Sequence, residues 1–265
     1  MAGILAGQSA IVTGAGRGFG RAIALQLAKA GASVTVTSRT QKQLDETVRL
    51  IEVAGGKGFA VAGDATEGKA ARNVAAAAAD RFGPVSILVN NAGVPDPFGP
   101  VGEIDPDRWW AAQAIHVYAP LLFMNAVLPG MAGRRRGHII NVSAFGGTVV
   151  APYLSAYCVG KAAQIRLTEH VAAEYKEQGV RAFAIDPGFV VTELAEETLA
   201  SPDAQRWLPG MMERLKSRRQ EPGAEQDLYR CGRRCVDLAS GRYDALSGKY
   251  MALDDDLDEM LKAVP

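Results

Sequence analysis

Short apolar, β-branched segments alternate with long amphipathic segments, and this alternation limits the possible folds more than any other feature. The segments typical of strands are 9–13, 33–38, 58–62, 85–90, 138–143, 180–186 and 248–252. The segments typical of helices are 18–30, 41–54, 67–82, 106–131, 153–178 and 226–240. Because apolar strands joined through helices need cover on both faces, the pattern predicts an α/β fold with a doubly wound parallel sheet.

Length and composition favour one domain over residues 1–265 and exclude several function classes. Lys plus Arg and Asp plus Glu both number 29, so the chain lacks the positive charge on which nucleic-acid binding depends. Its apolar runs are short and broken by Gly or Pro, which predicts no membrane-spanning segment.

The N-terminus does not resemble a signal peptide, and three cysteines are an odd number, so we expect a reducing, cytoplasmic location. No His lies near Cys231 and Cys235, so we expect no metal site.

A glycine-rich turn joins the first predicted strand to the first predicted helix. The residues of this turn that we expect to contact a ligand are Gly14, Gly16, Arg17, Gly18, Phe19 and Gly20. The glycines let the backbone turn sharply and approach a ligand, and the helix start offers unpaired N–H groups to a phosphate. Such a turn alone could be a tight connection, but its place after the first strand of a βαβ unit predicts a dinucleotide site.

The end of the second predicted strand indicates which dinucleotide binds. A carboxylate there would bind the ribose 2′-hydroxyl of NAD(H), but this chain has Ser38 and Arg39. Arg17 supplies a second guanidinium, and one guanidinium can donate two hydrogen bonds to the oxygens of a phosphate. We therefore predict NADP(H) in preference to NAD(H). The alternative is that both arginines are solvated surface charges.

Tyr157 and Lys161 are four residues apart at the start of a predicted helix, so both side chains lie on one face. A phenol has an unperturbed pKa of about 10, and a nearby ammonium favours the phenolate and lowers that pKa. Such a pair can transfer a proton to or from an alcohol or carbonyl oxygen. Alone the spacing is common, but beside a dinucleotide turn it predicts a catalytic pair.

Together these features resemble the short-chain dehydrogenase/reductase family. The matching motifs are the glycine turn, Asp64, Asn90-Asn-Ala-Gly93, Tyr157 with Lys161, and Asp186-Pro-Gly188 with Thr192. The resemblance covers nearly the whole chain and implies a Rossmann fold with a seven-stranded sheet. It also implies that residues 191–225 form a substrate lid, and that the protein is a homodimer or homotetramer.

The resemblance assigns further roles to residues of this chain. Tyr157 would be the general acid/base, and Lys161 would hold the nicotinamide ribose and lower the pKa of the phenol. The other residues implied at the coenzyme are Asp64 and Ala65 near the adenine, Asn91 and Gly93 along the ribose, and Pro187, Gly188, Val190 and Thr192 beside the nicotinamide.

The sequence departs from the family at the catalytic serine. The family places that serine 13 residues before the tyrosine, and here the position holds Ala144, with Ser143 one place earlier. Neighbouring strand side chains point to opposite faces, so Ser143 could replace the hydroxyl only if the strand has already ended. One alternative is that Tyr157 and Lys161 still catalyse the reaction with help from Ser143. The other is that Ala144 is an engineered replacement.

A second departure concerns the helix after the fourth strand. His116 aligns with the asparagine that holds a proton-relay water in the family. Imidazole both donates and accepts hydrogen bonds, so His116 is a candidate for the relay. The alternative is a structural histidine.

These observations favour an NADP(H)-dependent oxidoreductase that acts on the carbonyl or imine of a small molecule. The candidate substrate-pocket residues are mostly apolar: Phe145, Pro152, Tyr153, Phe189, Leu194, Trp207 and Met211. A mainly apolar substrate is therefore expected. Two alternatives remain open, a non-redox isomerase, cyclase or dehydratase on the same scaffold, and a cofactor-binding protein with weakened catalysis.

Overall fold

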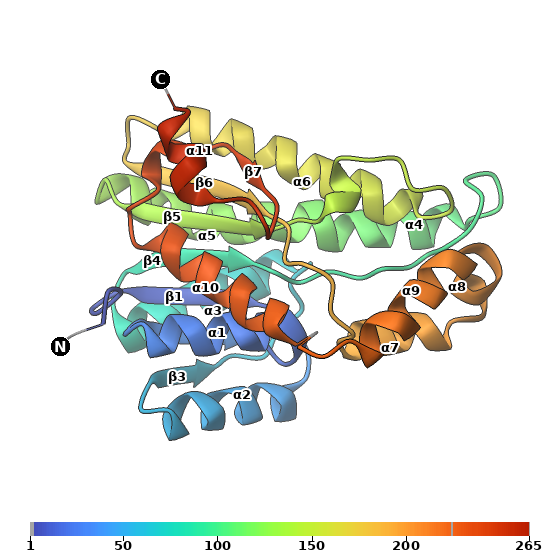
Figure 1. Cartoon of the computed structure of the whole chain (residues 1–265). Coiled ribbons are helices and arrows are strands. Elements are labelled where there is room, and N and C mark those ends of the chain that lie inside the picture. Colours follow the sequence, from blue (N-terminus) through green and yellow to red (C-terminus); the bar gives the residue numbers. More distant parts are fainter. Residues whose placement is uncertain (1–2, 224, 265) are drawn as a thin grey trace.

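A seven-stranded parallel sheet forms the centre of the computed structural model, which describes residues 3–223 and 225–264 (Figure 1). The strands are β1 (Ser9–Thr13), β2 (Ser33–Thr37), β3 (Lys57–Ala60), β4 (Val85–Asn90), β5 (Gly137–Val142), β6 (Val180–Ile185) and β7 (Tyr250–Met251). Their order is β3-β2-β1-β4-β5-β6-β7, and all neighbours are parallel. This confirms the predicted doubly wound, seven-stranded Rossmann fold.

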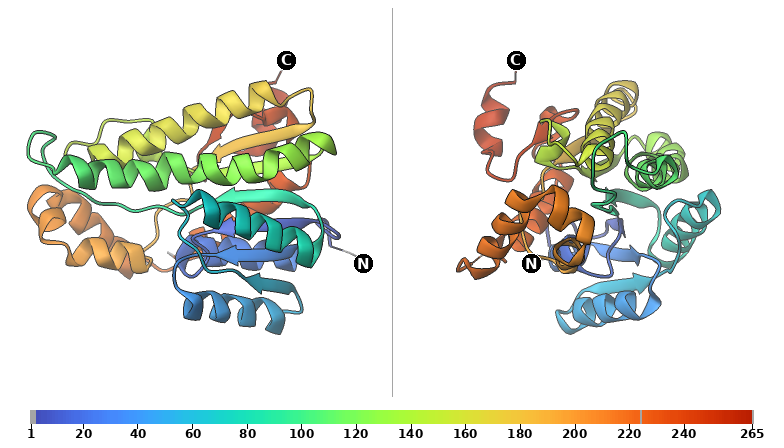
Figure 2. Two further views of the ribbon diagram at one scale, coloured as in Figure 1. Left: turned by 180° about the vertical axis from the view of Figure 1, so that it is seen from behind. Right: turned by 90° about the vertical axis from the view of Figure 1, so that its right-hand side faces the viewer.

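Helices cover both faces of the sheet (Figure 2). Those that pack on the sheet are α1 (Gly18–Lys29), α2 (Gln41–Val53), α3 (Gly68–Phe82), α5 (Ala119–Gly133), α6 (Ser155–Glu174) and α10 (Gln226–Ala239). Helices α1, α2 and α10 share one apolar cluster, and α3, α5 and α6 share the other. On β1, Ala10 and Val12 belong to the first cluster and Ile11 to the second, so a strand buried on both faces is apolar throughout.

The helix predicted over 106–131 consists of α4 (Pro106–Gln113), a π-helical turn η1 (Ala114–Tyr118) and α5. Asp105 caps its start, because its carboxylate accepts the N–H of Asp107. Taken as one helix, Pro106–Gly133 is long and apolar enough to cross a membrane, by length and composition alone. A core helix can pass the same test, so the expectation of no membrane-spanning segment stays a prediction. Half of the most apolar stretch of this helix is buried, and Phe123 and Met131 lie in the core beside the sheet, as in a core helix.

The segment predicted as a lid forms three short helices beside the sheet. These are α7 (Glu193–Ala200), α8 (Pro202–Trp207) and α9 (Pro209–Gln220), drawn in orange in Figure 1. A third small apolar cluster, which includes Phe98, Leu154, Met212 and Leu215, packs them against the loops after β4 and β5. The chain then enters α10 and β7, and the C-terminal residues form α11 (Leu257–Lys262), which Asp256 caps.

Candidate active site

A cleft of about 1160 Å³ follows the carboxyl ends of the strands, where β1 and β4 continue in opposite directions. Ligands of doubly wound sheets bind at this place. Every residue predicted for the coenzyme lines it: Gly14, Gly16, Arg17, Gly18, Phe19, Gly20, Ser38, Arg39, Asp64, Ala65, Asn91, Gly93, Tyr157, Lys161, Pro187, Gly188, Val190 and Thr192. The fold thus brings these distant segments together, and their individual roles stay predictions.

The glycine turn is fixed by close backbone packing. Gly14 and Gly18 have φ angles of +62° and +54°, in the left-handed region that favours glycine. A Cβ on Gly20 would lie 2.3 Å from the carbonyl oxygen of Gly14, so a larger residue does not fit there. Asn91, the residue after β4, supports the turn, because its Nδ2 donates to the carbonyl oxygens of Thr13 (2.9 Å) and Gly14 (3.2 Å). The result is a rigid cradle whose backbone can approach a phosphate.

Two arginines lie beside this cradle. Helix α1 begins after Arg17 without a side-chain cap, so its first N–H groups are available to an anion. The Arg17 Nη1 atom is paired with Glu197 of α7 at 2.6 Å. Arg39 is exposed and has no ion-pair partner in the part of the chain that the structure describes, and Ser38 Oγ is buried there without a hydrogen-bond partner. This donor set fits the 2′-phosphate of NADP(H).

Asp64 and Ala65 follow β3 at the same end of the cleft. One oxygen of Asp64 accepts hydrogen bonds from the backbone N (2.9 Å) and the Oγ1 (2.7 Å) of Thr66. These bonds, together with the nearby Arg39, hold the pKa of Asp64 below its usual value against the opposing effect of burial. The carboxylate is therefore a fixed negative charge at the end where an adenine is expected.

Tyr157 and Lys161 lie one turn apart on α6, and both line the cleft. Lys161 is only 4% exposed, and its Nζ donates to the carbonyl oxygen of Val142 at 2.6 Å and lies 3.4 Å from Gln164 Oε1. The same Nζ lies 5.7 Å from the centroid of the Tyr157 ring. The end of β5 therefore fixes the lysine beside the phenol.

Burial shifts the pKa values of both Tyr157 and Lys161. Burial raises the pKa of Tyr157, and the Asp186 carboxylate raises it further. Burial also lowers the pKa of Lys161 to about 7, with Asp186 opposing this shift. The net pKa of Tyr157 therefore lies above its ordinary value, because lost hydration disfavours the phenolate, and the lowering effect expected of Lys161 stays a prediction. At neutral pH the phenol retains its proton and is a proton donor.

His116 lies in the π-helical turn η1 and is fully buried against α6. A Cβ on Gly160 would lie 2.7 Å from His116 Cβ, so glycine permits the close approach. Because Nε2 lies 2.8 Å from the carbonyl oxygen of Val94, it carries the proton and donates. Burial, together with the charge of Lys161, lowers the pKa of His116 to about 3, so the ring is neutral. The ring meets Tyr157 edge to face, with centroids 5.4 Å apart.

The other imidazole nitrogen faces the catalytic pair. Nδ1 is buried and has no hydrogen-bond partner among residues 3–223 and 225–264. A Cβ on Gly93 would lie 3.5 Å from this Nδ1 and 3.7 Å from Lys161 Nζ, so glycine keeps the space between the two nitrogens clear. His116 can therefore accept a hydrogen bond on the side of Lys161.

Ser143 and Ala144 directly follow β5, at the place where the family has its catalytic serine. Ser143 is 1% exposed, and its Oγ donates to the carbonyl oxygen of Lys161 at 3.0 Å. Ala144 has extended backbone, with φ −170° and ψ 160°, so the two neighbouring side chains point to opposite sides. The Ser143 hydroxyl is thus bonded to the backbone of α6, which argues against its use as the replacement donor.

The substrate side of the cleft is mainly apolar, as the sequence indicated. Of the candidate pocket residues, the ones that line it are Phe145, Pro152, Phe189, Leu194 and Met211. Tyr153 and Trp207 are not among the lining residues, and their rings pack against each other at an angle of 34°, with centroids 5.2 Å apart. Arg214 of α9 adds a charge here, with its guanidinium 4.9 Å from the centroid of the Phe189 ring.

Several charged residues of the cleft were not singled out from the sequence. Asp186 was noted only as part of a motif, although its carboxylate affects both Tyr157 and Lys161. Glu197 and Asp227 also line the cleft. They belong to helices without a recognisable motif, so nothing in the sequence indicated that they reach the site.

Several proteins of known sequence are similar to this chain. The short chain dehydrogenase family model matches residues 8–203. The short chain dehydrogenase MYCFIDRAFT_6125 of Pseudocercospora fijiensis (strain CIRAD86) is 36% identical over 264 residues, which cover 98% of this chain and 84% of the relative. The gluconate 5-dehydrogenase of Gluconobacter oxydans (strain 621H) is 31% identical over 204 residues, or 77% of this chain and 79% of the relative.

Two crystal structures have the same architecture. A protein assigned as a short-chain alcohol dehydrogenase, from Sinorhizobium meliloti 1021, has a TM-score of 0.81 at 30% identity, over 94% of this chain and 96% of that one. A protein assigned as an NAD(P)-dependent gluconate 5-dehydrogenase, from Beutenbergia cavernae and with NADP bound at low occupancy, has a TM-score of 0.80 at 29% identity over the same shares. The present chain belongs to the short-chain dehydrogenase family, whose members are NAD(P)-dependent oxidoreductases.

Proposed function

We propose that this protein is an NADP(H)-dependent oxidoreductase that interconverts a carbonyl and an alcohol, or an imine and an amine, on a mainly apolar small molecule. One observation carries the proposal: a protonated phenol, Tyr157, lies in a cleft that joins the glycine cradle to an apolar wall. The nicotinamide, when bound, supplies or accepts the hydride.

The preference for NADP(H) rests on the charges beside the glycine cradle. Arg17 and Arg39 line that end of the cleft, and the end of β2 carries Ser38 where NAD(H) binding would favour a carboxylate. A 2′-phosphate would accept hydrogen bonds from both guanidinium groups. The Beutenbergia cavernae protein, with NADP bound at low occupancy, supports the same choice.

In the reducing direction, Tyr157 donates its hydroxyl proton to the substrate oxygen or nitrogen. Lys161 has a pKa of about 7, so its ammonium form stabilises the phenolate that remains and then returns a proton. His116 stays neutral, and its Nδ1 accepts a hydrogen bond from a water molecule beside Lys161. In this proposal His116 orients the relay water rather than carrying the proton itself.

We further propose a cytoplasmic homo-oligomer, either a dimer or a tetramer. All three cysteines are free thiols, which suits a reducing compartment. Large apolar side chains are exposed on the helices that follow β4 and β5: Trp110, Tyr118, Leu121 and Val159. Such residues suit a contact with a second copy of the chain. Light scattering of the purified protein tests this, and a monomeric mass at micromolar concentration would overturn it.

The coenzyme assignment is tested by measuring the affinity of the purified protein for NADPH and NADH, and its turnover with apolar ketones and imines. We expect tighter binding of NADPH and oxidation of NADPH that matches product formation. Arg39→Ala should weaken NADPH binding by about tenfold and leave NADH binding unchanged. Equal binding of the two coenzymes by the wild-type chain would contradict the assignment.

The position of Ala144 favours a second candidate function, a non-redox isomerase, cyclase or dehydratase. The side chain at 144 offers no hydrogen-bond donor to the reacting oxygen, and the Ser143 hydroxyl is bonded elsewhere. Loss of one such donor typically reduces turnover by about 10²–10³. A product that forms without a change in coenzyme oxidation state would favour this second function.

A further inference from the structure

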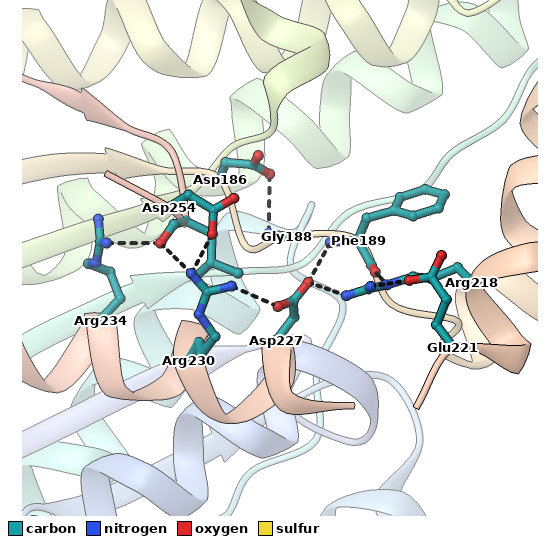
Figure 3. Close-up of polar contacts among 10 residues, drawn as sticks. Asp186, Gly188, Phe189, Arg218, Glu221, Asp227, Arg230, Arg234 and Asp254 are labelled. Carbon is teal, nitrogen blue, oxygen red and sulfur yellow. Dashed lines mark hydrogen bonds and ion pairs between the residues drawn. The ribbon is translucent and has the colours of Figure 1, made fainter. Parts of the chain in front are cut away.

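A buried carboxylate lies under the loop that follows β6. Asp227, in the first turn of α10, is 8% exposed. It accepts hydrogen bonds from Arg218 Nη2 at 2.9 Å, Arg230 Nη1 at 3.1 Å and the backbone N of Phe189 at 3.4 Å (Figure 3). Its oxygen also packs against Gly188, where a Cβ would lie 2.9 Å away. Asp227 thus connects the lid helix α9, the helix α10 and the loop beside the coenzyme cleft.

Phe189 is held on three sides by this arrangement. Its N–H donates to Asp227, its carbonyl oxygen accepts from Arg218 Nε at 2.8 Å, and its ring lies under the Arg214 guanidinium at 4.9 Å. Arg214 and Arg218 are one turn apart on α9. Since Phe189 lines the substrate side of the cleft, the position of this wall depends on α9 and α10.

The same network continues to the C-terminal segment. Arg230 donates to the carboxylate of Asp254 and to the carbonyl oxygen of Leu253, and Arg234 donates to the carbonyl oxygens of Ala252 and Leu253. The segment 252–254 also borders the cleft. Three lining segments far apart in the sequence are therefore connected through one helix.

A neighbouring ion pair of α9 provides a contrast. Arg219 pairs with Glu196 of α7, and the two side chains are 52% and 49% exposed. Counted over the side chains alone, Arg218 and Asp227 are 25% and 11% exposed. Exposed pairs contribute little, whereas removal of Arg218 would leave the buried Asp227 carboxylate with Arg230 as its one remaining ion-pair partner among the described residues. Of these two pairs, only Arg218–Asp227 reaches from the lid to the loop beside the coenzyme.

We propose that Arg218 and Asp227 are positioning residues that fix Phe189 and the lid at the distance from Tyr157 that the substrate requires. They act through Phe189 and do not contact the reacting atoms. This inference rests on the proposed oxidoreductase function, because it assigns the substrate wall of that same site.

The matched test compares Arg218→Met with Arg219→Met, which removes an identical side chain one position away. Steady-state kinetics with an apolar ketone and NADPH binding are measured for each, together with hydrogen exchange of residues 187–192. We expect Arg218→Met to raise the KM for the ketone about fivefold or more, with kcat and NADPH affinity within about twofold, and to speed exchange at 187–192. Arg219→Met should match the wild type in all of these, and Arg218→Lys should lie between.

Asp227→Asn, which preserves size, is the second variant in case Arg218→Met unfolds. It should raise the KM and speed exchange in the same segment. Equal KM values and equal exchange for Arg218→Met and Arg219→Met would overturn the inference, as would unchanged values for Asp227→Asn. If the wild-type chain reduces no carbonyl compound, the proposed function fails, but the exchange comparison still decides whether these residues position the loop.

Discussion

The glycine cradle and the segment predicted as a lid line one cleft, yet different forces fix them. The cradle is held by steric limits on the backbone, as at Gly14 and Gly20. The lid helices α7 to α9 are held by a small apolar cluster and by ion pairs such as Arg17–Glu197. Steric limits allow few residue types and so leave a motif, whereas many sequences can form a charge pair. The side of the cleft that binds a constant coenzyme is therefore the side that the sequence reveals.

The largest expected effect belongs to Tyr157, which lines the cleft that the cradle and the lid segment share. Tyr157→Phe removes the proton donor, so we expect turnover to fall by about 10²–10⁴ while NADPH affinity changes less than about twofold. Tyr153→Phe is the matched control, because Tyr153 packs against Trp207 outside the cleft lining. Stopped-flow and steady-state rates measure both variants. An unchanged rate in Tyr157→Phe would exclude the proposed mechanism.

A pair of glycine substitutions tests the contrast between cradle and lid directly. Gly20→Ala places a Cβ 2.3 Å from the Gly14 carbonyl oxygen, so we expect a loss of about 1–3 kcal/mol in the free energy of unfolding and much weaker coenzyme binding. A Cβ at Gly210, in α9 of the lid, would meet nothing within 4 Å, so Gly210→Ala should be neutral or stabilising by about 0.5–1 kcal/mol. Denaturant titrations measure both. Similar costs at the two positions would contradict the contrast.

A smaller effect is expected at positions 143 and 144, where the family has its catalytic serine. Ala144→Ser adds a hydroxyl beside the cleft, and we expect it to raise kcat for carbonyl reduction by about tenfold. Ser143→Ala removes a hydroxyl that is bonded to the carbonyl oxygen of Lys161, so it should change kcat by less than about threefold. The reverse outcome, a large loss in Ser143→Ala, would show that Ser143 supplies the donor.

The sequence was sufficient to predict the sheet and a set of residues that share one cleft. Strand periodicity predicted the strands, with small errors at the edges: β7 covers only Tyr250–Met251. It did not reveal that residues 193–220 form three helices. Two of these helices begin at a proline, Pro202 and Pro209, which suits the first position of a helix but interrupts a helical sequence pattern. Nor did it reveal the direction of the Tyr157 shift, because burial depends on the packing of the whole site rather than on a four-residue spacing.

The smallest expected effect concerns the ion pair that joins the two halves. Arg17 is paired with Glu197 at 2.6 Å, so the carboxylate occupies a guanidinium that we assign to the 2′-phosphate. Because this pair is substantially exposed, its contribution is only about 0–1 kcal/mol. Glu197→Gln should therefore tighten NADPH binding by up to about fivefold and leave NADH binding unchanged.

The matched control for that variant is Glu196→Gln, which removes the neighbouring carboxylate paired with Arg219 inside the lid. Isothermal titration with NADPH and NADH at low and at high salt separates the two variants. The advantage of Glu197→Gln should disappear at high salt, because screening already weakens an exposed pair. Equal tightening for both coenzymes would mean that Glu197 restricts the cleft as a whole, and that the lid and the cradle are coupled by access rather than by competition for Arg17.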